Sequence, residues 1–451
     1  MDSWELYRRA CGYLNEGLIR TGDPPADPGR TRREWMESFL PDLGHPERAF
    51  EALHVAGTSG KGSVATMIAE VLCAAGIPTG LHVSPYLQVA TEKLWADGRY
   101  ASAEELAALV DWIRPLCEAR RRPEVPLHGM ASVAVALEML RRSGARFGVV
   151  EAGVGGRNDL TNVLRTRVAV VTALGLDHVK TLGPDLRSIA WHKAGIIRPG
   201  CRAVVLEGPE IVEAATEQAR RVGAELRVLS RDCFSSRLDD DGRTRITYRG
   251  PRLALEDAPL AMRGPFQGEN AGLALAALEA LELPLDEQAL RAGLGRARLP
   301  GRLELLPAAE HSPCPVLLDG AHNPDKLRAM ISGLAPLRPG GALHVVYGAL
   351  GSRTPDTELA RLAAMADSFV VTEPAVYQKS PRPAAEILEV VGRACAGTTA
   401  HVRAEDALDA ALGRARPGDL VLITGSLYLC GELRERWFPA REVVARRTSW
   451  W

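Results

Sequence analysis

The stretch LHVAGTSGKGS (53–63) decides the fold, because a short apolar run passes through a glycine loop into a helical pattern, GSVATMIAEVLCAAG (62–76). A triphosphate site needs these parts: glycines let backbone N–H groups approach the phosphates, and the helix N-terminus favours an anion. The sequence does not match the strict P-loop motif, since Gly62 separates Lys61 from Ser63 and position 55 is Val. A glycine-rich turn that binds no phosphate is the alternative. We predict a phosphate site made of Gly57, Thr58, Ser59, Gly60, Lys61, Gly62 and Ser63.

The pattern around this stretch predicts an α/β fold. Short runs of Val, Leu and Ala alternate with longer helical patterns, as in βαβ units that share a buried parallel sheet. A helix is expected at 269–281, and strands are expected at 52–57, 147–153, 168–174, 201–208, 315–320, 343–350, 368–374 and 419–426. Residues 230–262 break this rhythm with polar, Asp-rich and Gly-rich sequence, and we expect a small antiparallel patch on the edge of the first sheet.

The length of 451 residues exceeds the size at which one core usually stops growing, so two or three domains are expected. A second set of strands begins after RLPGR (298–302), whose Pro and Gly suit a hinge. We therefore predict domains at 1–299 and 300–451. The stretch 20–33 is expected to be an exposed loop, and the tail AREVVARRTSWW (440–451) is expected to pack on the body rather than to bind a partner.

Composition points to an ordinary soluble protein. Hydrophobic residues make up 46% and charged residues 25%, and 55 basic side chains nearly cancel 56 acidic ones. Nothing here indicates a nucleic-acid or membrane surface, and the N-terminus has no signal-peptide pattern. We expect a cytoplasmic protein. The eight cysteines are scattered without a CxxC pair, so we expect them to be small buried apolar residues.

Polar side chains gather after two of the predicted strands and in a nearby helical pattern, where ligands collect in open parallel sheets. Glu151 ends FGVVE, Asp177 and His178 follow VVTALGL, and Lys193 lies in IAWHKAGI. A carboxylate and an imidazole there could hold Mg²⁺, which prefers oxygen and tolerates few protein ligands. Each has an alternative: Glu151 could cap a helix, His178 could be an ordinary loop histidine, and Lys193 could lie on a solvated face. Their shared position beside the phosphate loop favours a functional site.

These residues resemble the Mur-ligase superfamily and, within it, the dihydrofolate synthase/folylpolyglutamate synthase family. The resemblance covers nearly the whole chain, and its motifs occur in the family's order. They are HVAGTSGKGS (54–63), SPYL (84–87), VEAGVGGRNDLTNV (150–163), GLDHVKTLG (175–183), HKAGIIRPG (192–200), GENAGLALAALEAL (268–281), PGRLE (300–304), LLDGAHNP (317–324), VYGALGSR (346–353) and VLITGSLYL (421–429). The resemblance implies an N-terminal P-loop-type ATPase domain with a mostly parallel sheet, a smaller C-terminal Rossmann-like α/β domain, and an active site between them.

The resemblance also implies ligands for ATP and metal at matching positions. Lys61 and its loop hold the β- and γ-phosphates, Ser84 and Glu151 bind one Mg²⁺ ion, and His178 helps to bind a second. Lys193 matches a lysine that relatives carry as a carbamate.

Further implied site residues lie toward the C-terminal half. Asn270, Arg302 and Asp319 are expected at the nucleotide, and His322 is expected near the phosphates and the incoming amino acid, where it is a plausible general base. Ser426 is a weaker candidate. The implied activity is ATP-dependent: a carboxylate acceptor, dihydropteroate or folate in first place, becomes an acyl phosphate and is joined to L-glutamate. A monomer is the family-based expectation.

Several positions depart from the family pattern. Pro126–Met130 replaces a TxFE-like segment and lacks its aromatic and acidic residues, while Lys93 stands where an arginine is usual. Ser59 replaces an asparagine, and Arg353 keeps a positive charge where an acidic residue is lost. Because most changes fall on the acceptor side, two ligase readings stay open: a divergent folate enzyme, or a ligase for another carboxylic acid in specialised metabolism. A non-catalytic nucleotide-binding regulatory protein is disfavoured by the retained Lys61 and its neighbours.

Overall fold

The computed structural model describes residues 2–18, 30–239, 242–338, 340–351, 355–376 and 379–451. Most of the predicted loop at 20–33 lies outside these residues, and so does Arg353. The end of that stretch belongs to a helix, α2 (Arg32–Glu37), which Thr31 begins by a reciprocal capping box with Glu34. Among the described helices, none has the length and apolar character needed to span a bilayer.

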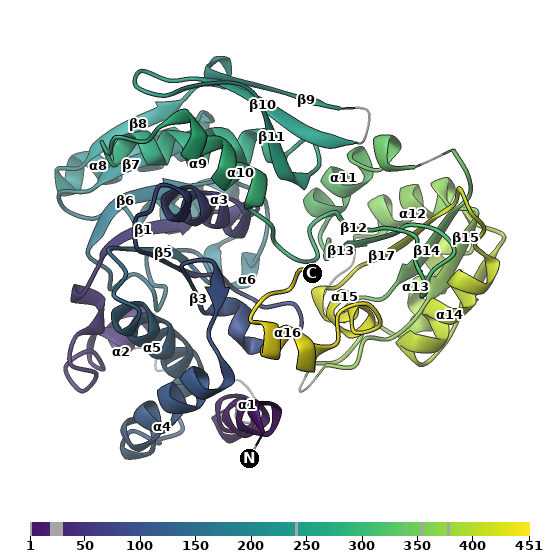
Figure 1. Cartoon of the computed structure of the whole chain (residues 1–451), viewed down its shortest axis with the longest axis horizontal. Coiled ribbons are helices and arrows are strands. Elements are labelled where there is room, and N and C mark those ends of the chain that lie inside the picture. Colours follow the sequence, from purple (N-terminus) through teal and green to yellow (C-terminus); the bar gives the residue numbers. More distant parts are fainter. Residues whose placement is uncertain (1, 19–29, 240–241, 339, 352–354, 377–378) are drawn as a thin grey trace.

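Eight strands form the larger sheet, in the order β4-β3-β2-β5-β1-β6-β7-β8 (Figure 1). They are β1 Glu51–Ala56, β2 Thr79–His82, β3 Trp95–Ala96, β4 Arg99–Tyr100, β5 Phe147–Glu151, β6 Thr166–Val171, β7 Arg202–Leu206 and β8 Glu225–Leu229. All neighbours from β2 to β8 in this order pair parallel, while β3 and β4 add an antiparallel edge. Parallel register places Val55 beside Glu151 and Ala56 beside Val171, so the carboxyl ends of β1, β5 and β6 meet.

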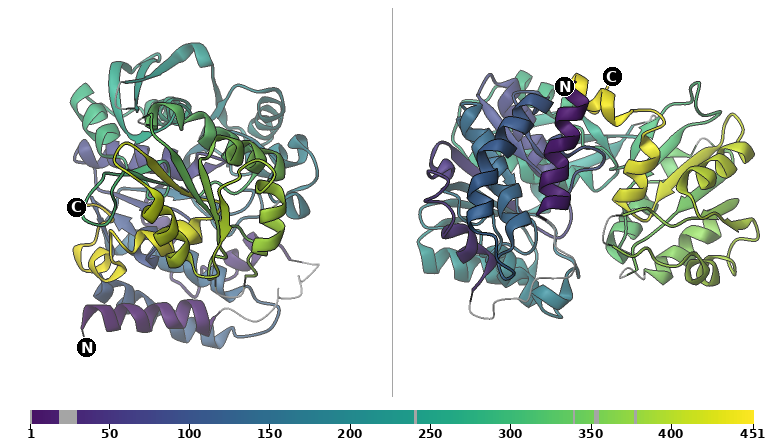
Figure 2. Two further views of the ribbon diagram at one scale, coloured as in Figure 1. Left: turned by 90° about the vertical axis from the view of Figure 1, so that its right-hand side faces the viewer. Right: turned by 90° about the horizontal axis from the view of Figure 1, so that it is seen from below.

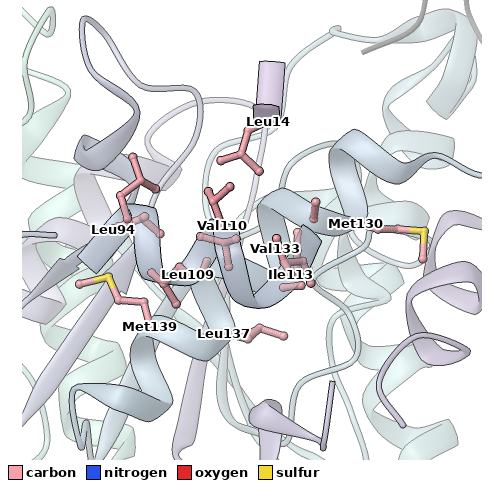
Figure 3. Packing of buried hydrophobic residues seen from close by; sticks show 14 of the residues in the cluster. Leu14, Leu94, Leu109, Val110, Ile113, Met130, Val133, Leu137 and Met139 are labelled. Carbon is pink, nitrogen blue, oxygen red and sulfur yellow. The ribbon is translucent and has the colours of Figure 1, made fainter. Parts of the chain in front are cut away.

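Helices cover both faces of this sheet, because successive side chains of a strand point to opposite faces. Leu53 and Val55 face a layer of α3, α9 and α10. Ala52 and Ala56 face the other layer, which consists of α1, α4 and α5 on one side and α7 and α8 on the other. Figure 3 shows α4 and α5 interlocking through buried leucine, valine and isoleucine side chains. The bounds are α1 Ser3–Gly12, α3 Lys61–Ala74, α4 Ala103–Ala119, α5 Leu127–Arg142, α6 Val179–Leu182, α7 Leu186–Ala194, α8 Pro209–Val222, α9 Gln267–Ala280 and α10 Glu287–Arg296.

The polar segment at 230–262 forms a separate three-stranded antiparallel sheet, in the order β11-β10-β9. Its strands are β9 Phe234–Leu238, β10 Arg243–Arg249 and β11 Ala254–Arg263. The antiparallel prediction is confirmed, but its predicted place on the edge of the first sheet is wrong. The alternating apolar residues of β10 and β11 pack over α9 and α10, which would otherwise expose an apolar surface.

The second large sheet has six strands, in the order β12-β13-β17-β14-β15-β16, and all of its pairs are parallel except β12 with β13. Helices α11, α12 and α13 cover one face, and α14 and α15 cover the other. The strands are β12 Glu304–Leu306, β13 Val316–Asp319, β14 Leu343–Tyr347, β15 Ser368–Val371, β16 Thr398–Ala400 and β17 Leu420–Thr424. The helices are α11 Pro324–Ser332, α12 Asp356–Met365, α13 Ala384–Val391, α14 Ala404–Arg414, α15 Leu427–Arg434 and α16 Ala440–Arg446. Every strand predicted from the sequence is present, and the predicted boundary near residue 300 stays a prediction.

The chain crosses between the two large sheets a second time after α15. Helix α16 returns to pack beside α1, as the right-hand view of Figure 2 shows, and Arg441 pairs with Asp2 at 3.0 Å. Farther on, the backbone N–H of Tyr100 donates to the carbonyl of Arg447. The predicted packing of the tail on the body is confirmed, although Trp451 keeps 47% of its surface exposed. The tail therefore joins the C-terminal part of the chain to the N-terminal helical layer.

Arg434 is the residue on which this return depends. Its guanidinium is fully buried, donates to Glu304 at 2.8 Å and to Gln88, and donates to the carbonyl of Ser449 at 2.6 Å. These partners come from β12, from the N-terminal part of the chain and from the tail. The ring of Phe438 lies 4.0 Å from the guanidinium carbon.

All eight cysteines are free thiols within the described residues, and five of them are buried, as the sequence predicted. The other three, Cys11, Cys73 and Cys233, are partly exposed.

We predict that Arg434→Met lowers the free energy of unfolding by about 3–5 kcal/mol, because it leaves the buried carboxylate of Glu304 without its counter-charge. Urea denaturation followed by circular dichroism measures this change. Arg436→Met is the control, since Arg436 pairs with more exposed acids and its loss should cost about 1 kcal/mol or less. Equal losses in the two variants would contradict the role given to Arg434.

Candidate active site

The glycine loop after β1 has the shape that a phosphate site requires. Gly57 has a φ of 154°, and a Cβ there would lie 1.8 Å from the Thr172 hydroxyl oxygen. Gly60 has a φ of 84°, and a Cβ there would lie 2.1 Å from Oδ1 of Asn270. Thr58 is fixed by a backbone bond to the carbonyl of Ala173. The loop is therefore held against the β6 end and against α9, and Asn270 lies beside it.

Glu151 joins the phosphate loop to the next strand end. Its Oε1 lies 3.5 Å from Nζ of Lys61, and its Oε2 accepts a 3.0 Å hydrogen bond from the backbone N–H of Ser84. The carboxylate is only 5% exposed. The structure therefore brings Lys61, Ser84 and Glu151 together, and Glu151 faces the loop that holds Ser84 instead of capping a helix.

Lys193 lies in α7 and is 3% exposed, which rules out the reading as a solvated surface lysine. Burial lowers the pKa of its ammonium to about 7; the charges of Lys61 and Lys326 act in the same direction, while Asp177 opposes them. A large fraction of the amine is therefore neutral near pH 7. The influence of Lys61 places this amine at the phosphate loop.

His178 stands at the start of α6 in a left-handed conformation, with φ 52°. Its side chain is 43% exposed, and its Nε2 lies 4.0 Å from the carboxylate of Asp177. Asp177 in turn contacts the second half of the chain, since its Oδ2 accepts from Nδ2 of Asn323 at 3.2 Å and lies 3.5 Å from Nζ of Lys326. These contacts join the β6 loop to the start of α11.

His322 belongs to the same junction. Its Nδ1 lies 2.8 Å from the carbonyl of Gly320, and its Nε2 lies 3.3 Å from Nζ of Lys326. A carbonyl only accepts hydrogen bonds, so Nδ1 carries the proton and Nε2 carries the lone pair. Asn323 caps α11 by accepting from the N–H of Lys326, which orients that lysine.

Asp319, the last residue of β13, fixes the backbone near Leu303 and Ala321 by hydrogen bonds. Its Oδ2 accepts from the N–H of Leu303 at 2.9 Å, and its Oδ1 accepts from the N–H of Ala321. Burial raises its pKa, and the charge of Arg302 opposes this rise. Asp319 and Arg302 therefore lie together beside Gly301, whereas Ser426 serves as the N-cap of α15.

A cavity of about 1510 Å³ is lined by both halves of the chain and reaches the site at Ser84 and Glu151. Ser84 and Glu151 contribute to it from the first half, and Lys379 and Tyr428 contribute from the second. The segment at 126–129, together with Lys93, forms part of its wall. Positions where the sequence departs from the family pattern therefore line the cavity.

The described residues contain no group of three or more His, Cys, Asp and Glu side chains placed to hold a metal. The arrangement still suits Mg²⁺, which takes one or two protein oxygens and fills its other positions with water and phosphate oxygens. Glu151 and Ser84 offer such oxygens next to the phosphate loop.

Sequence reasoning overlooked Lys326 and Asn323, which connect His322 to Asp177. The motif HNPDK carried a usable signal, because Asn before Pro is a typical helix start and Lys326 follows His322 by one helical turn. It also overlooked Tyr86 and Tyr428, whose rings supply aromatic surface to the cavity. Nothing in local sequence indicates that Tyr428 comes close to a loop more than three hundred residues earlier.

We predict that Gly60→Ala weakens ADP binding by at least about tenfold, because the new Cβ would overlap the Asn270 side chain and move the loop. Titration calorimetry with ADP measures the change. Gly98→Ala is a matched control, since its φ of 88° imposes similar backbone strain but nothing lies within 4 Å of the added Cβ. Unchanged ADP affinity in Gly60→Ala would contradict the placement of the phosphates.

Family models and known proteins match this chain over most of its length. The Mur ligase middle domain matches residues 55–278, and the Mur ligase glutamate ligase domain matches residues 301–427. The dihydrofolate synthase/folylpolyglutamate synthase of Bacillus subtilis is 31% identical over 444 residues, covering 95% of this chain and 99% of the relative. The Escherichia coli enzyme of the same name is 31% identical over 84% of this chain and 85% of its own.

Solved structures agree with this placement. The folylpolyglutamate synthase of Mycobacterium tuberculosis complexed with ADP is 29% identical and superposes with a TM-score of 0.85 over 96% of this chain and 98% of the other. E. coli FolC in complex with DHPP and ADP is 28% identical, with a TM-score of 0.79 over 98% of each chain. The chain therefore belongs to the dihydrofolate synthase/folylpolyglutamate synthase family of Mur ligases, whose members are ATP-dependent ligases that form an amide bond.

Proposed function

We propose that this protein is an ATP-dependent ligase that joins L-glutamate to a carboxylic acid held in the large cavity. The observation that carries the proposal is the position of Glu151, which contacts Lys61 of the phosphate loop and also lines the cavity. A carboxylate bound in the cavity thus lies next to the bound phosphates. Family membership supports the same activity.

The reaction follows from this arrangement. A carboxylate oxygen of the acceptor attacks the γ-phosphorus of ATP, the bond to the β-phosphate oxygen breaks, and ADP leaves. Lys61 and the loop N–H groups stabilise the charge on the transferring phosphoryl group. The amine of L-glutamate then attacks the acyl phosphate, and phosphate leaves as the amide forms. Since water would hydrolyse the acyl phosphate, we expect the two halves of the chain to close over the site.

Ser84, Glu151 and His178 are the residues that we propose for Mg²⁺, in two sites, with Ser84 and Glu151 in one and His178 in the other. Bound Mg²⁺ would neutralise part of the phosphate charge. The proximity of the Glu151 carboxylate to the Ser84 loop and to Lys61 supports the first site. The exposed imidazole of His178, next to Asp177, supports the second.

Lys193 is proposed to carry a carbamate. A neutral amine attacks CO₂ and loses a proton, which converts the side chain into a carboxylate. The lowered pKa of Lys193 supports this, because the neutral amine is the reactive form. The positive charge of Lys61 nearby would stabilise the carbamate once formed.

His322 is proposed as the general base that takes a proton from the incoming amine. Its Nε2 bears the lone pair, and Lys326 holds that edge of the ring at the junction with Asp177. Asn270, Arg302 and Asp319 are proposed to lie at the nucleotide, supported by the closeness of Asn270 to Gly60 and by the influence of the Arg302 charge on the pKa of Asp319.

Dihydropteroate or a folate is the acceptor that we propose first, since the relatives are dihydrofolate and folylpolyglutamate synthases. Tyr86 and Tyr428 supply aromatic surface in the cavity even though the segment at 126–130 has none. A different carboxylic acid is the second candidate, favoured by Lys93 and His128 on the cavity wall. The phosphate loop with Lys61, Glu151 and Lys193 in place speaks against a non-catalytic regulatory protein.

The domain boundary is proposed near residue 300, between the two large sheets, supported by the ends of the matched family models at 278 and 301. We propose that the enzyme works as a monomer in the cytoplasm, a reducing compartment that suits its free cysteines.

Lys61→Met and Glu151→Gln are predicted to lower ligation by about 100-fold or more, because each removes a charge from the phosphate side of the site. The assay follows ADP release with L-glutamate, Mg²⁺ and, separately, dihydropteroate, reduced folates and unrelated carboxylic acids, with products identified by mass. Lys180→Met is the control, since Lys180 is an exposed lysine on α6. Full activity in either site variant, with circular dichroism unchanged, would refute the assignment. Turnover only with an acid unrelated to pterins would favour the second candidate.

The carbamate prediction is that activity falls in buffer freed of CO₂ and returns on addition of bicarbonate. Since the pKa of Lys193 is about 7, recovery should be poorer below pH 7, where the amine is protonated, and better above it. Lys193→Arg should be weakly active and should not respond to bicarbonate. NMR with isotope-labelled CO₂ detects the carbamate directly, and a wild-type enzyme without that signal and without a bicarbonate response would refute it.

A further inference from the structure

One wall of the cavity carries a partly buried ammonium group without a counter-ion. Lys93 is the last residue of a short 3-10 helix, Ala90–Lys93, and its Nζ donates to the hydroxyl of Ser132 at 2.9 Å and lies 5.4 Å from the centre of the Tyr86 ring. Within the part of the chain that the structure describes, no carboxylate pairs with it. The adjacent Glu92 is turned away and accepts from the N–H groups of Leu87 and Gln88.

His128 lies on the same wall, in the first turn of α5. Its imidazole makes no hydrogen bond within the described residues, yet it lines the cavity. Burial, with the charges of Lys93 and Lys379, lowers the pKa of His128 to about 4, so the ring is neutral and offers one N–H. Lys93, Ser132 and His128 thus form a donor cluster.

The surroundings of the donor cluster favour an electron-rich partner. A second, small pocket of about 20 Å³ adjoins the cluster and is lined by apolar side chains that include Leu14, Leu94 and Leu106. Figure 3 shows Leu14 and Leu94 among the packed side chains there. Their low polarity strengthens any interaction with the ammonium and raises the cost of leaving it unpaired.

One carboxylate on the cavity wall, Asp159, already has hydrogen-bond partners. Its Oδ2 accepts from the N–H of Val154 and its Oδ1 accepts from the hydroxyl of Thr161. No ion pair joins Asp159 to Lys93 within the described residues.

We propose that the donor cluster recognises a second electron-rich oxygen of the acceptor acid, distinct from the carboxylate that becomes the acyl phosphate. This inference rests on the proposed ligase function and refines its substrate class. Two acceptors provide such an oxygen: a pterin through its ring carbonyl, or another acid through a second carboxylate. The cluster selects against acceptors whose remote end offers only hydrogen-bond donors or apolar surface.

The test compares two matched pairs of acceptors by titration calorimetry in the presence of ADP and Mg²⁺. The first pair is dihydropteroate and its analogue without the ring carbonyl. The second is a pteroate analogue with a carboxyphenyl group in place of the pterin, and the methyl ester of that remote carboxyl. We expect the member with the free oxygen to bind about 10-fold to 100-fold more tightly in at least one pair, as for a hydrogen bond to a charged group. The pair that shows the difference identifies the source of the oxygen.

Variants decide whether the donor cluster is responsible. Lys93→Met should remove the preference within that pair, whereas Lys93→Arg should keep it. Lys180→Met, which removes an exposed lysine outside the cavity lining, should leave the preference unchanged. Lys93→Met should also raise the Tm of the unliganded enzyme, because it removes a partly buried unpaired charge; a lysine with only a structural role would lower the Tm on substitution.

Equal binding within both pairs, or a preference that survives in Lys93→Met, would overturn the inference. Its failure is distinct from failure of the proposed function, because ADP release from ATP with L-glutamate is measured separately on the same protein preparation. An enzyme that ligates without discriminating within the pairs refutes the donor cluster alone. An enzyme that discriminates in binding but never releases ADP supports the donor cluster and refutes the ligase.

Discussion

The register of three parallel strands is the constraint on which the site depends. Because Val55 of β1 pairs beside Glu151 and Ala56 pairs beside Val171, the loops that leave β1, β5 and β6 start from one edge of the sheet. The phosphate loop, Glu151 and the segment with Asp177 are thereby brought together, and contacts such as Glu151 with Lys61 and Thr58 with Ala173 hold them there. A slip of one residue between β1 and β5 would turn Glu151 to the other face and separate it from Lys61. The sheet core, built from residues such as Leu53 and Val149, therefore secures the chemistry as well as the fold.

The part of the chain that forms the second large sheet contacts the rest of the protein at two places, one near the site and one far from it. Near the site, Asp177 contacts the start of α11 through Asn323 at 3.2 Å and through Lys326, whose side chain is 26% exposed, at 3.5 Å. Far from it, Arg434 is fully buried and bonds to the hinge side, to the N-terminal part of the chain and to the tail. Buried charge-assisted bonds break at much greater cost than exposed ones. Relative motion of the two sheets should therefore open the Asp177 side while the Arg434 side acts as the fixed end.

The sequence allowed the main elements to be predicted because their signals are local. Runs such as FGVVE and VLLD are apolar on both sides, as buried parallel strands must be, and the glycine loop is spelled out by residues 57–62. The position of β9–β11 was mispredicted because alternation shows that one face is buried but not against what. The short strands β3 and β4 were missed because two residues carry no period. Lys326 and Tyr428 were missed as site residues because their neighbours come from the other half of the chain.

The positions that depart from the family pattern gain a common explanation from the structure. Lys93 and His128 are far apart in sequence, and each change taken alone looks like a loss: an arginine fork in one case and an aromatic face in the other. In the fold they meet on one cavity wall, around Ser132. A partly buried ammonium that no carboxylate balances lowers stability, so its presence at a cavity is more readily understood as a binding group than as packing. On the phosphate side, by contrast, Lys61 is balanced by its contact with Glu151. The phosphate end of the cavity keeps the residues that react with ATP, whereas the wall with Lys93 and His128 differs from the family pattern. A ligase with this division can change its acceptor while its reaction with ATP stays the same.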